Sequence, residues 1–203
     1  MKDASILPVI ISESKLNELE QKPEVGRIVF LKGSWRTYDH PNSTDAKKRL
    51  EQNIYVKSIE VHNDYPVKTR NKFEFEGVLV KKIFEIERDA EGNPLKDEFG
   101  RLIPKKDEDG NAKYTVRKNK EGQIVNDFIV AINRPNGSDY VPCIAYRKLA
   151  NYIAEEVEVA SEVEGYGYIR MREYEFAGEK QVAYEAVITS LAVKEPEEEQ
   201  DEE

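Results

Sequence analysis

The sequence predicts an all-β protein with short helices, built from one complete five-stranded barrel, a partial second unit of the same kind and an inserted β-hairpin arm. Three observations support this prediction: apolar and polar residues alternate in several segments, glycine-centred turn sequences separate them, and one stretch of the chain is repeated. The chain has 203 residues and a hydrophobic fraction of 39%, which is enough for folded cores of that size.

The first two strands of the complete barrel lie in residues 71–88 and 122–134. Both segments, "NKFEFEGVLVKKIFEIER" and "GQIVNDFIVAINR", alternate apolar and polar residues at period two. Gly77 lies inside the first segment and predicts a bend in that strand, because glycine in a strand often marks a bulge or a close backbone approach.

A third strand, "DYVPCIAY", follows a turn "RPNGSD" and leads into residues 147–158. There Leu149, Ile153 and Val157 recur at helical spacing, which predicts a short amphipathic helix. Two further strands follow, joined by a turn at "AGEK". The order strand, strand, strand, helix, strand, strand fits a closed barrel of the OB type over residues 71–193.

A long polar insertion, residues 89–121, separates the first two of these strands. The turn sequences "DAEG", "DEFG", "DEDG" and "NKEG" in and beside it each place an acidic or amide residue three positions before a glycine. Glycine supplies the positive φ that tight turns require, so the insertion is predicted to form a protruding β-hairpin arm.

The first half of the chain repeats part of the second. Residues 5–36 match residues 139–170 at a constant offset of 134, with eight identities in 32 positions, where unrelated sequences give roughly two. Residues 1–67 are therefore expected to form a partial OB-like unit of strand, helix, strand and strand. Either the chain begins after the first two strands of this unit, or its edges are completed by another part of the protein or by a second copy, since open strand edges invite pairing.

Charge and cysteine content restrict the possible functions. The net charge is −9, but seven acids lie in the last nine residues, and without them it is −2, so the body of the protein can still carry a basic face. Residues 194–203 are predicted to be an acidic, disordered tail. The single cysteine, Cys143, excludes an internal disulfide and a cysteine-cluster metal site, and we expect it in the core.

Membrane and catalytic functions find no support in the sequence. No apolar run is long enough to span a membrane or to act as a signal peptide, so we expect a cytoplasmic protein with no membrane contact. The two histidines, His40 and His62, lie apart, and no nucleophile motif, phosphate loop or metal-ligand spacing appears. We therefore expect no catalytic residue, no metal and no cofactor, and a protein that is not an enzyme.

Aromatic and cationic side chains share one face of the predicted barrel. Because side chains in strands alternate, Val141, Cys143 and Ala145 belong to the interior, while the tyrosines of the same strand point outward. The outward set of the third and fourth strands comprises Tyr140, Tyr146, Tyr168, Arg170, Arg172 and Tyr174. Rings on which bases stack and guanidinium groups that meet phosphates are what single-stranded nucleic acid requires.

Further cations extend this track. Arg134, Arg147 and Lys148 lie at the ends of neighbouring strands. In the arm, Tyr114, Arg117 and Lys118 are candidate contacts along a bound strand, and a solvated hairpin is the alternative.

Three alternatives to DNA binding remain open at this point. Tyrosines at period two with neighbouring arginines are also typical of ordinary cross-strand packing. RNA uses the same stacking, and no residue here reports on the 2′-hydroxyl. The tyrosine face and the arm also suit an OB-fold protein-interaction module that docks a replication, restart or defence-related protein.

The complete unit resembles bacterial single-stranded DNA-binding proteins, the homo-oligomeric OB-fold SSB family. The matching segments are "FEFEGVLVKK", "FIVAINR", "DYVPCIAYRKLA" and "EGYGYIRMREY". The resemblance implies non-catalytic binding and protection of single-stranded DNA in replication, recombination or repair, with bases stacked on Tyr140, Tyr146 and Tyr174, and a homo-oligomeric assembly. The two-unit arrangement is similar to two-OB SSB-like proteins of Gram-positive bacteria and their mobile elements.

Two departures from the family pattern affect these expectations. SSB tails usually end in a proline-phenylalanine tip that docks into replication proteins, whereas this tail ends "QDEE", which counts against such partners. The first unit carries Ile6 and Ser12 where the second has stacking tyrosines, and Trp35 aligns with Ile169 on the core side. We therefore expect DNA contact mainly on the second unit and Trp35 in the core.

Overall fold

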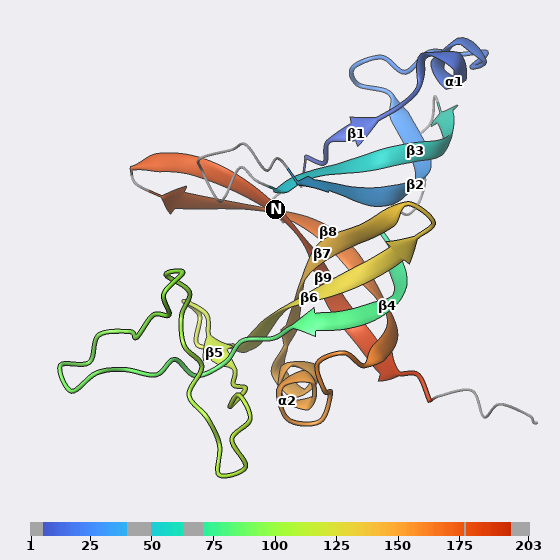
Figure 1. The fold of residues 1–203 in the computed structure, drawn as a ribbon. Helices are drawn as coiled ribbons and strands as arrows, with labels where there is room; N and C mark the ends of the chain where they lie inside the picture. The colour runs from blue at the N-terminus through green and yellow to red at the C-terminus, as the bar shows by residue number, and fades with distance from the viewer. Residues whose placement is uncertain (1–5, 40–49, 63–70, 177, 196–203) are drawn as a thin grey trace, which may run out of the picture.

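The computed structural model describes residues 6–39, 50–62, 71–176 and 178–195, and most of the predicted tail lies outside them. The described chain forms a three-stranded sheet of order β1-β3-β2 and a six-stranded sheet of order β4-β8-β9-β7-β6-β5 (Figure 1). It contains two short helices, α1 and α2. The predicted all-β class with short helices is confirmed.

The larger sheet closes into a barrel because its first strand pairs with two neighbours. The N-terminal part of β4 (Phe73–Lys81) pairs with β8 (Glu162–Phe176), and its C-terminal part pairs with β6 (Ile124–Arg134). The change of partner occurs next to Gly77, where an added Cβ would lie only 2.4 Å from the carbonyl oxygen of Ala131. The bend predicted at Gly77 thus closes the ring of strands.

The remaining barrel strands have the predicted order. β7 (Gly137–Tyr146) pairs antiparallel with β6 and parallel with β9 (Glu179–Val193), and β9 pairs antiparallel with β8. Helix α2 (Arg147–Glu155) connects β7 to β8, as an OB barrel requires.

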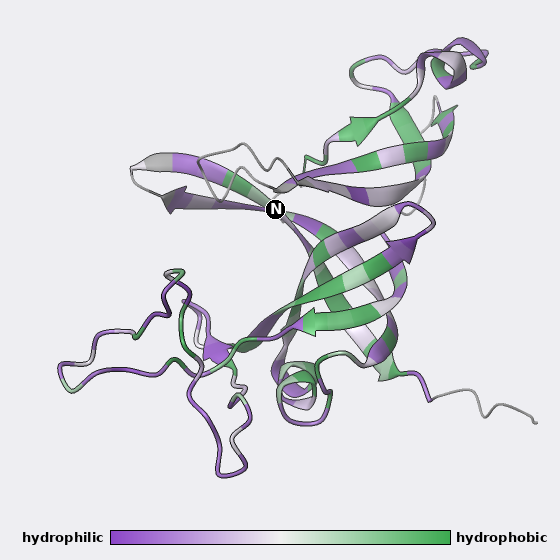
Figure 2. Ribbon diagram, viewed as in Figure 1, coloured by the Kyte–Doolittle hydropathy of each residue, from purple (hydrophilic) through white to green (hydrophobic). Residues whose placement is uncertain are grey.

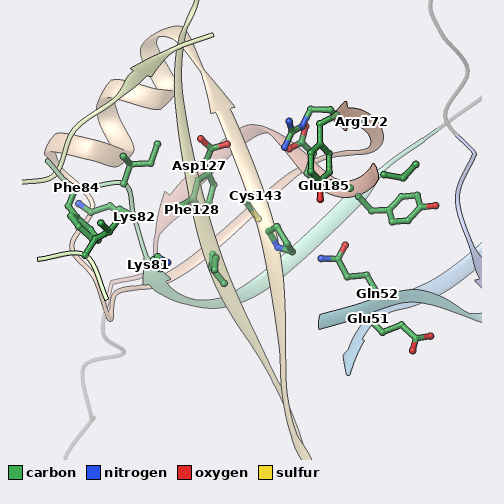
Figure 3. Close-up of a pocket in the computed structure, with 18 of the residues that line it drawn as sticks. Glu51, Gln52, Lys81, Lys82, Phe84, Asp127, Phe128, Cys143, Arg172 and Glu185 are labelled. Atoms are coloured by element: carbon green, nitrogen blue, oxygen red, sulfur yellow. The ribbon is translucent and has the colours of Figure 1, made fainter. Parts of the chain in front are cut away.

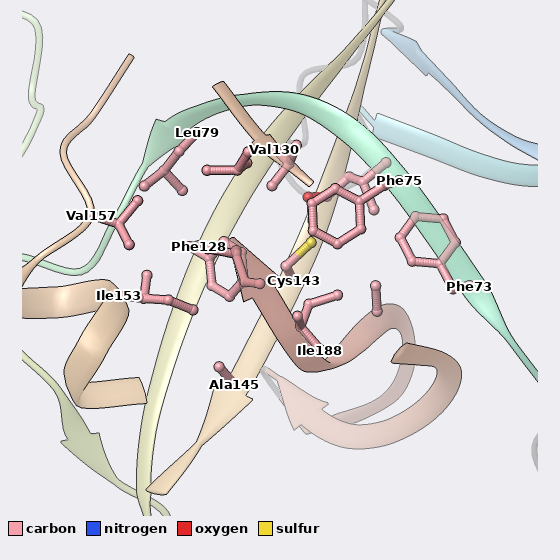
Figure 4. Packing of buried hydrophobic residues seen from close by; sticks show 14 of the residues in the cluster. Phe73, Phe75, Leu79, Phe128, Val130, Cys143, Ala145, Ile153, Val157 and Ile188 are labelled. Atoms are coloured by element: carbon pink, nitrogen blue, oxygen red, sulfur yellow. Dashed lines mark hydrogen bonds between the residues drawn. The ribbon is translucent and has the colours of Figure 1, made fainter. Parts of the chain in front are cut away.

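The barrel interior is filled by alternate side chains of these strands, with Ile153 of α2 packed below them (Figure 4). Val141, Cys143 and Ala145 are all buried, as the alternation of β7 predicts. Burial raises the pKa of the Cys143 thiol, because a low dielectric disfavours the thiolate. Cys143 is therefore a core residue, as expected.

The predicted arm is present between β4 and β6 and is mostly hydrophilic (Figure 2). Its four turns repeat one geometry, in which the glycine N–H donates to the carbonyl of the acidic or amide residue three positions earlier. Gly92, Gly100, Gly110 and Gly122 all have positive φ, between 77° and 86°. The turn sequences therefore form the tight turns that they predict.

The arm branches into short hairpins instead of running as two long strands. Its backbone hydrogen bonds form closed triangles: Leu95 donates to Glu87, Ile103 donates to Leu95, and Glu87 donates to Ile103, at 2.9 to 3.1 Å. Glu85, Lys105 and Lys113 form a second triangle at 2.8 Å. The branching follows from closely spaced turns, which leave too few residues between them for long strands. Only β5 (Arg117–Lys118) extends the barrel sheet.

The first half of the chain reproduces the second part of the barrel. β1 (Val9–Ile10) pairs parallel with β3 (Leu50–His62), as β7 pairs with β9, and β2 (Ile28–Asp39) pairs antiparallel with β3, as β8 pairs with β9. The repeated glycines, Gly33 and Gly167, both lie at a register shift where an added Cβ would meet a backbone oxygen within 2.5 Å. This close approach explains why both copies carry glycine.

The strand and helix that open the first unit are shorter than expected. The predicted strand over residues 6–12 is reduced to β1, and the predicted helix over residues 13–21 is reduced to α1 (Glu13–Asn17). No residue of α1 is buried, whereas α2 buries Ala150, Ile153 and Ala154. Without tertiary packing a short helix gains little stability beyond its capped first turn.

The two units contact each other through β2 of the first unit and the β6–β7 hairpin and the start of β4 of the second. Asp139, only 1% exposed, accepts from the guanidinium of Arg36 at 2.8 Å and from the backbone N–H of Thr37 at 2.9 Å. Trp35, predicted in the core, is buried with its ring 5.6 Å from that of Phe73. A buried carboxylate and an aromatic contact therefore join the units.

We predict that Asp139→Ala lowers the free energy of unfolding by about 3 kcal/mol, because it leaves half-buried guanidinium groups and a backbone N–H without their partner. Urea denaturation measures the change. The control Asp109→Ala, at an exposed position in the arm, should change stability by less than about 0.5 kcal/mol. Equal effects of the two substitutions would show that Asp139 does not join the units.

Candidate nucleic-acid interface

The predicted tyrosines and arginines of β7 and β8 lie on the outer face of the barrel, on either side of β9. β9 lies between the other two strands, and Arg170 of β8 is paired across the ladder with Glu185 of β9. Below them, Val125, Ile144 and Val187 form a second, smaller apolar cluster against which Tyr146 packs. This outer cluster supports Tyr146 on the outer face of the barrel.

A cleft of about 800 Å³ opens on this face (Figure 3). It is bounded by β6, β7, β8 and β9, by the segment that leaves β4, by Leu102 of the arm and by Glu51, Gln52 and Asn53 of the first unit. Its barrel wall includes Asp127, Pro142, Arg172, Tyr174, Tyr184 and Glu185. The arm and the first unit therefore both contribute to one hollow that the sequence could not locate.

The four predicted tyrosines differ in exposure and position. Tyr140 is 47% exposed and Tyr168 is 38% exposed, so both present rings to solvent. Tyr146 and Tyr174 are half-buried, and only Tyr174 lines the cleft. The structure thus places these rings on the outer face without gathering them into a single pocket.

The two predicted arginines of β8 are paired with a carboxylate that the sequence analysis missed. Arg170 donates to Glu185 from Nε at 3.1 Å and to the hydroxyl of Tyr146 at 2.7 Å. Burial opposes the charge of Arg170, but these hydrogen bonds leave its pKa raised. Arg172 lies 3.6 Å from the same carboxylate, with its guanidinium carbon 5.4 Å from the centre of the Tyr174 ring. Glu185 therefore fixes both guanidinium groups beside the tyrosines.

The cations at the strand ends fall into two groups. Nε of Arg134 lies 3.2 Å from Asp139, so this side chain belongs to the junction between the units. Arg147 and Lys148 are exposed at the start of α2. Arg147 has φ +57°, a left-handed conformation that favours glycine.

The candidate arm contacts also have partners within the protein. Arg117 donates to both carboxylate oxygens of Asp127, and this hydrogen bond raises the pKa of Arg117. The Tyr114 ring lies 4.1 Å from the ammonium of Lys82, which is buried and donates to two carbonyls at the end of α2. Lys118 is exposed. Tyr114 is thus part of the attachment of the arm to the barrel.

Several residues of this region were not predicted from the sequence. Asp127, Tyr184 and Glu185 line the cleft. Tyr166 is 52% exposed on β8, and Phe99 is 70% exposed at an arm turn, with the Arg101 guanidinium 4.8 Å from its ring. The outward parity of Asp127 is readable from β6, but its ion pair with Arg117 depends on the pairing of β5 with β6.

Known structures share this fold. The wild-type single-stranded DNA binding protein from Thermus aquaticus matches the chain with a TM-score of 0.54 and 13% identity, over 88% of this chain and 63% of that one. A deletion mutant of the same protein matches with a TM-score of 0.55 and 15% identity, over 85% of this chain and 65% of that one. The similarity shows a shared fold. The chain spans less than two thirds of the length of these proteins.

The match is structural and extends beyond the barrel. The match covers 85% of this chain, and residues 71–195 make up a smaller share than that. The superposition therefore includes part of the first unit. No protein-family model matches the sequence, and no curated protein matches it. Within the described residues, no helix is long and apolar enough to cross a membrane, and no cluster of three or more His, Cys, Asp or Glu side chains is arranged to hold a metal ion.

We predict that Arg147→Gly raises the free energy of unfolding by about 1 kcal/mol, because glycine adopts the left-handed conformation without strain. The control Lys148→Gly, one position further into α2, should instead lower it by about 1 kcal/mol. Urea denaturation of both variants measures the difference. A loss of stability in both would mean that the Arg147 backbone is not strained.

Proposed function

We propose that the protein binds and protects single-stranded DNA without catalysing a reaction. The observation that supports this most is the outer face of the barrel, where Arg172, Tyr174 and Tyr184 line a cleft of about 800 Å³. The fold is shared with the single-stranded DNA binding protein from Thermus aquaticus. Stacking surfaces beside cations suit a flexible strand better than a duplex, whose bases are already stacked.

The proposed contacts divide into stacking and phosphate groups. Bases stack on Tyr140, Tyr146 and Tyr174, with Tyr168 beside them. Arg147 and Lys148 are exposed, so these two cations are the first to meet phosphates. Arg170, Arg172 and Arg134 already contact carboxylates, so a phosphate must share or replace Glu185 or Asp139. Of the candidate arm contacts, Lys118 is exposed, whereas Arg117 is paired with Asp127.

The two units are assigned different tasks in this proposal. Residues 71–193 form the DNA-binding domain, and residues 1–67 serve assembly or auxiliary binding. Thr37 of the first unit supports this division. Its hydroxyl accepts from the backbone N–H of Tyr140 at 2.8 Å, so the first unit helps to position a stacking residue of the second. Cytoplasmic replication, recombination or repair and a homo-oligomeric state belong to the same proposal.

One observation favours the second candidate function, a protein-interaction module. Phe99 is 70% exposed and Leu102 is 39% exposed on the arm, and Leu102 lines the cleft. Exposed apolar side chains on a projecting segment suit a protein partner as well as a base. Ionic strength separates the two functions, because phosphate contacts weaken with salt and a tyrosine-rich protein interface depends on it much less.

We predict that the double variant Tyr140→Ala, Tyr146→Ala binds a fluorescent oligo-dT at least about thirtyfold more weakly, since each stacked base contributes about 1–3 kcal/mol. Fluorescence anisotropy measures the affinity, and circular dichroism checks the fold. The control Tyr55→Ala removes a comparably exposed tyrosine from the first unit and should leave the affinity unchanged. An unaltered affinity of the double variant would remove the proposed stacking platform.

We predict that the affinity for oligo-dT falls steeply with salt. Each neutralised phosphate contributes about −0.7 to the slope of log K against log salt concentration, so five contacts give a slope of about −3.5. Titrations at several salt concentrations measure it. The variant Lys148→Gln should reduce the slope by about 0.7. A slope near zero would contradict phosphate contacts and favour the protein-interaction alternative.

A further inference from the structure

The walls of the cleft have the composition of a site for a planar, largely uncharged group. Tyr174, Tyr184 and Pro142 provide rings, and Ile129 and Val182 provide apolar side chains. Binding sites for small organic groups are mainly apolar and carry a few convergent polar atoms. An unstacked nucleobase has this shape.

The charges that line the cleft do not favour phosphate. Three carboxylates and three cations line it, so among the described residues they cancel. Two of the cations are engaged: Lys82 donates to the carbonyls of Ala154 and Val157, and Arg172 contacts Glu185. A phosphate in the cleft would approach carboxylates without a surplus of positive charge, whereas a neutral base would not be repelled.

The carboxylates instead provide acceptors at the barrel wall. The contacts of Glu185 with Arg170 and Arg172 are made through Oε1, which leaves Oε2 to accept another hydrogen bond. Asp127 receives one N–H from Arg117 on each oxygen, and each oxygen retains a second acceptor position. A carboxylate oxygen accepts a hydrogen bond and does not donate one.

We propose that the cleft binds an unstacked base and selects one with an exocyclic amino group, so that cytosine is preferred to thymine. Cytosine presents an N4 amino donor to Glu185 or Asp127, whereas thymine presents the O4 acceptor at the same position and is repelled. The two bases are similar in size, so stacking on the cleft tyrosines does not separate them strongly. This inference rests on the proposed function and adds a base preference to it.

The test compares labelled oligo-dC and oligo-dT of equal length, binding to the full chain, by fluorescence anisotropy at one salt concentration. We expect oligo-dC to bind about tenfold more tightly than oligo-dT. Glu185→Gln should reduce this ratio to about one or reverse it, because an amide both donates and accepts and can pair with thymine O4. Asp127→Asn is a second test variant, at a side chain that is 39% exposed.

The control Glu173→Gln removes the same charge from an exposed position next to Tyr174 and outside the cleft lining. It should keep the wild-type ratio. Equal binding of both oligonucleotides by the wild type would overturn the base preference and leave the proposed function intact. A dC preference that survives in both Glu185→Gln and Asp127→Asn would also overturn it. Failure of the wild type to bind either oligonucleotide would overturn the inference and the proposed function together.

Discussion

The pairing of β4 with both β8 and β6 is the constraint on which the rest of the structure depends. It requires a backbone approach at Gly77 that no side chain permits. Once the ring is closed, alternate residues of every strand are assigned to the core or to the outer face. The tyrosines of β7 and β8, the Glu185 carboxylate and the cleft all take their positions from that closure.

The outer face is more balanced in charge than a simple cationic track. Arg117, Arg134, Arg170 and Arg172 each contact a carboxylate of Asp127, Asp139 or Glu185. Such pairs hold guanidinium groups in fixed positions, which lowers the conformational entropy lost on binding. They also weaken any attraction for phosphate, because the partner charge must be shared or displaced. The face therefore suits contacts with bases as much as contacts with the backbone of a strand.

Local patterns predicted much of the architecture. Alternation placed Val141, Cys143 and Ala145 inside the barrel, and the repeat predicted that β1, β2 and β3 follow the topology of β7, β8 and β9. The predicted lengths of the first strand and helix were wrong. No residue of α1 is buried, so the tertiary packing that would lengthen the helix is absent. The branching of the arm was also missed, since its hydrogen-bond triangles join residues from different turns.

By itself the sequence determined the all-β class, the strand order, the turns of the arm and which side chains of each strand share a face, because these depend on residue type and spacing within a segment. Only the tertiary structure decided which arginines meet Glu185, how Asp139 joins the units and where the cleft lies. Those features depend on register between strands and on contacts between residues about a hundred positions apart, such as Arg36 and Asp139. Spacing along one segment carries no information about either.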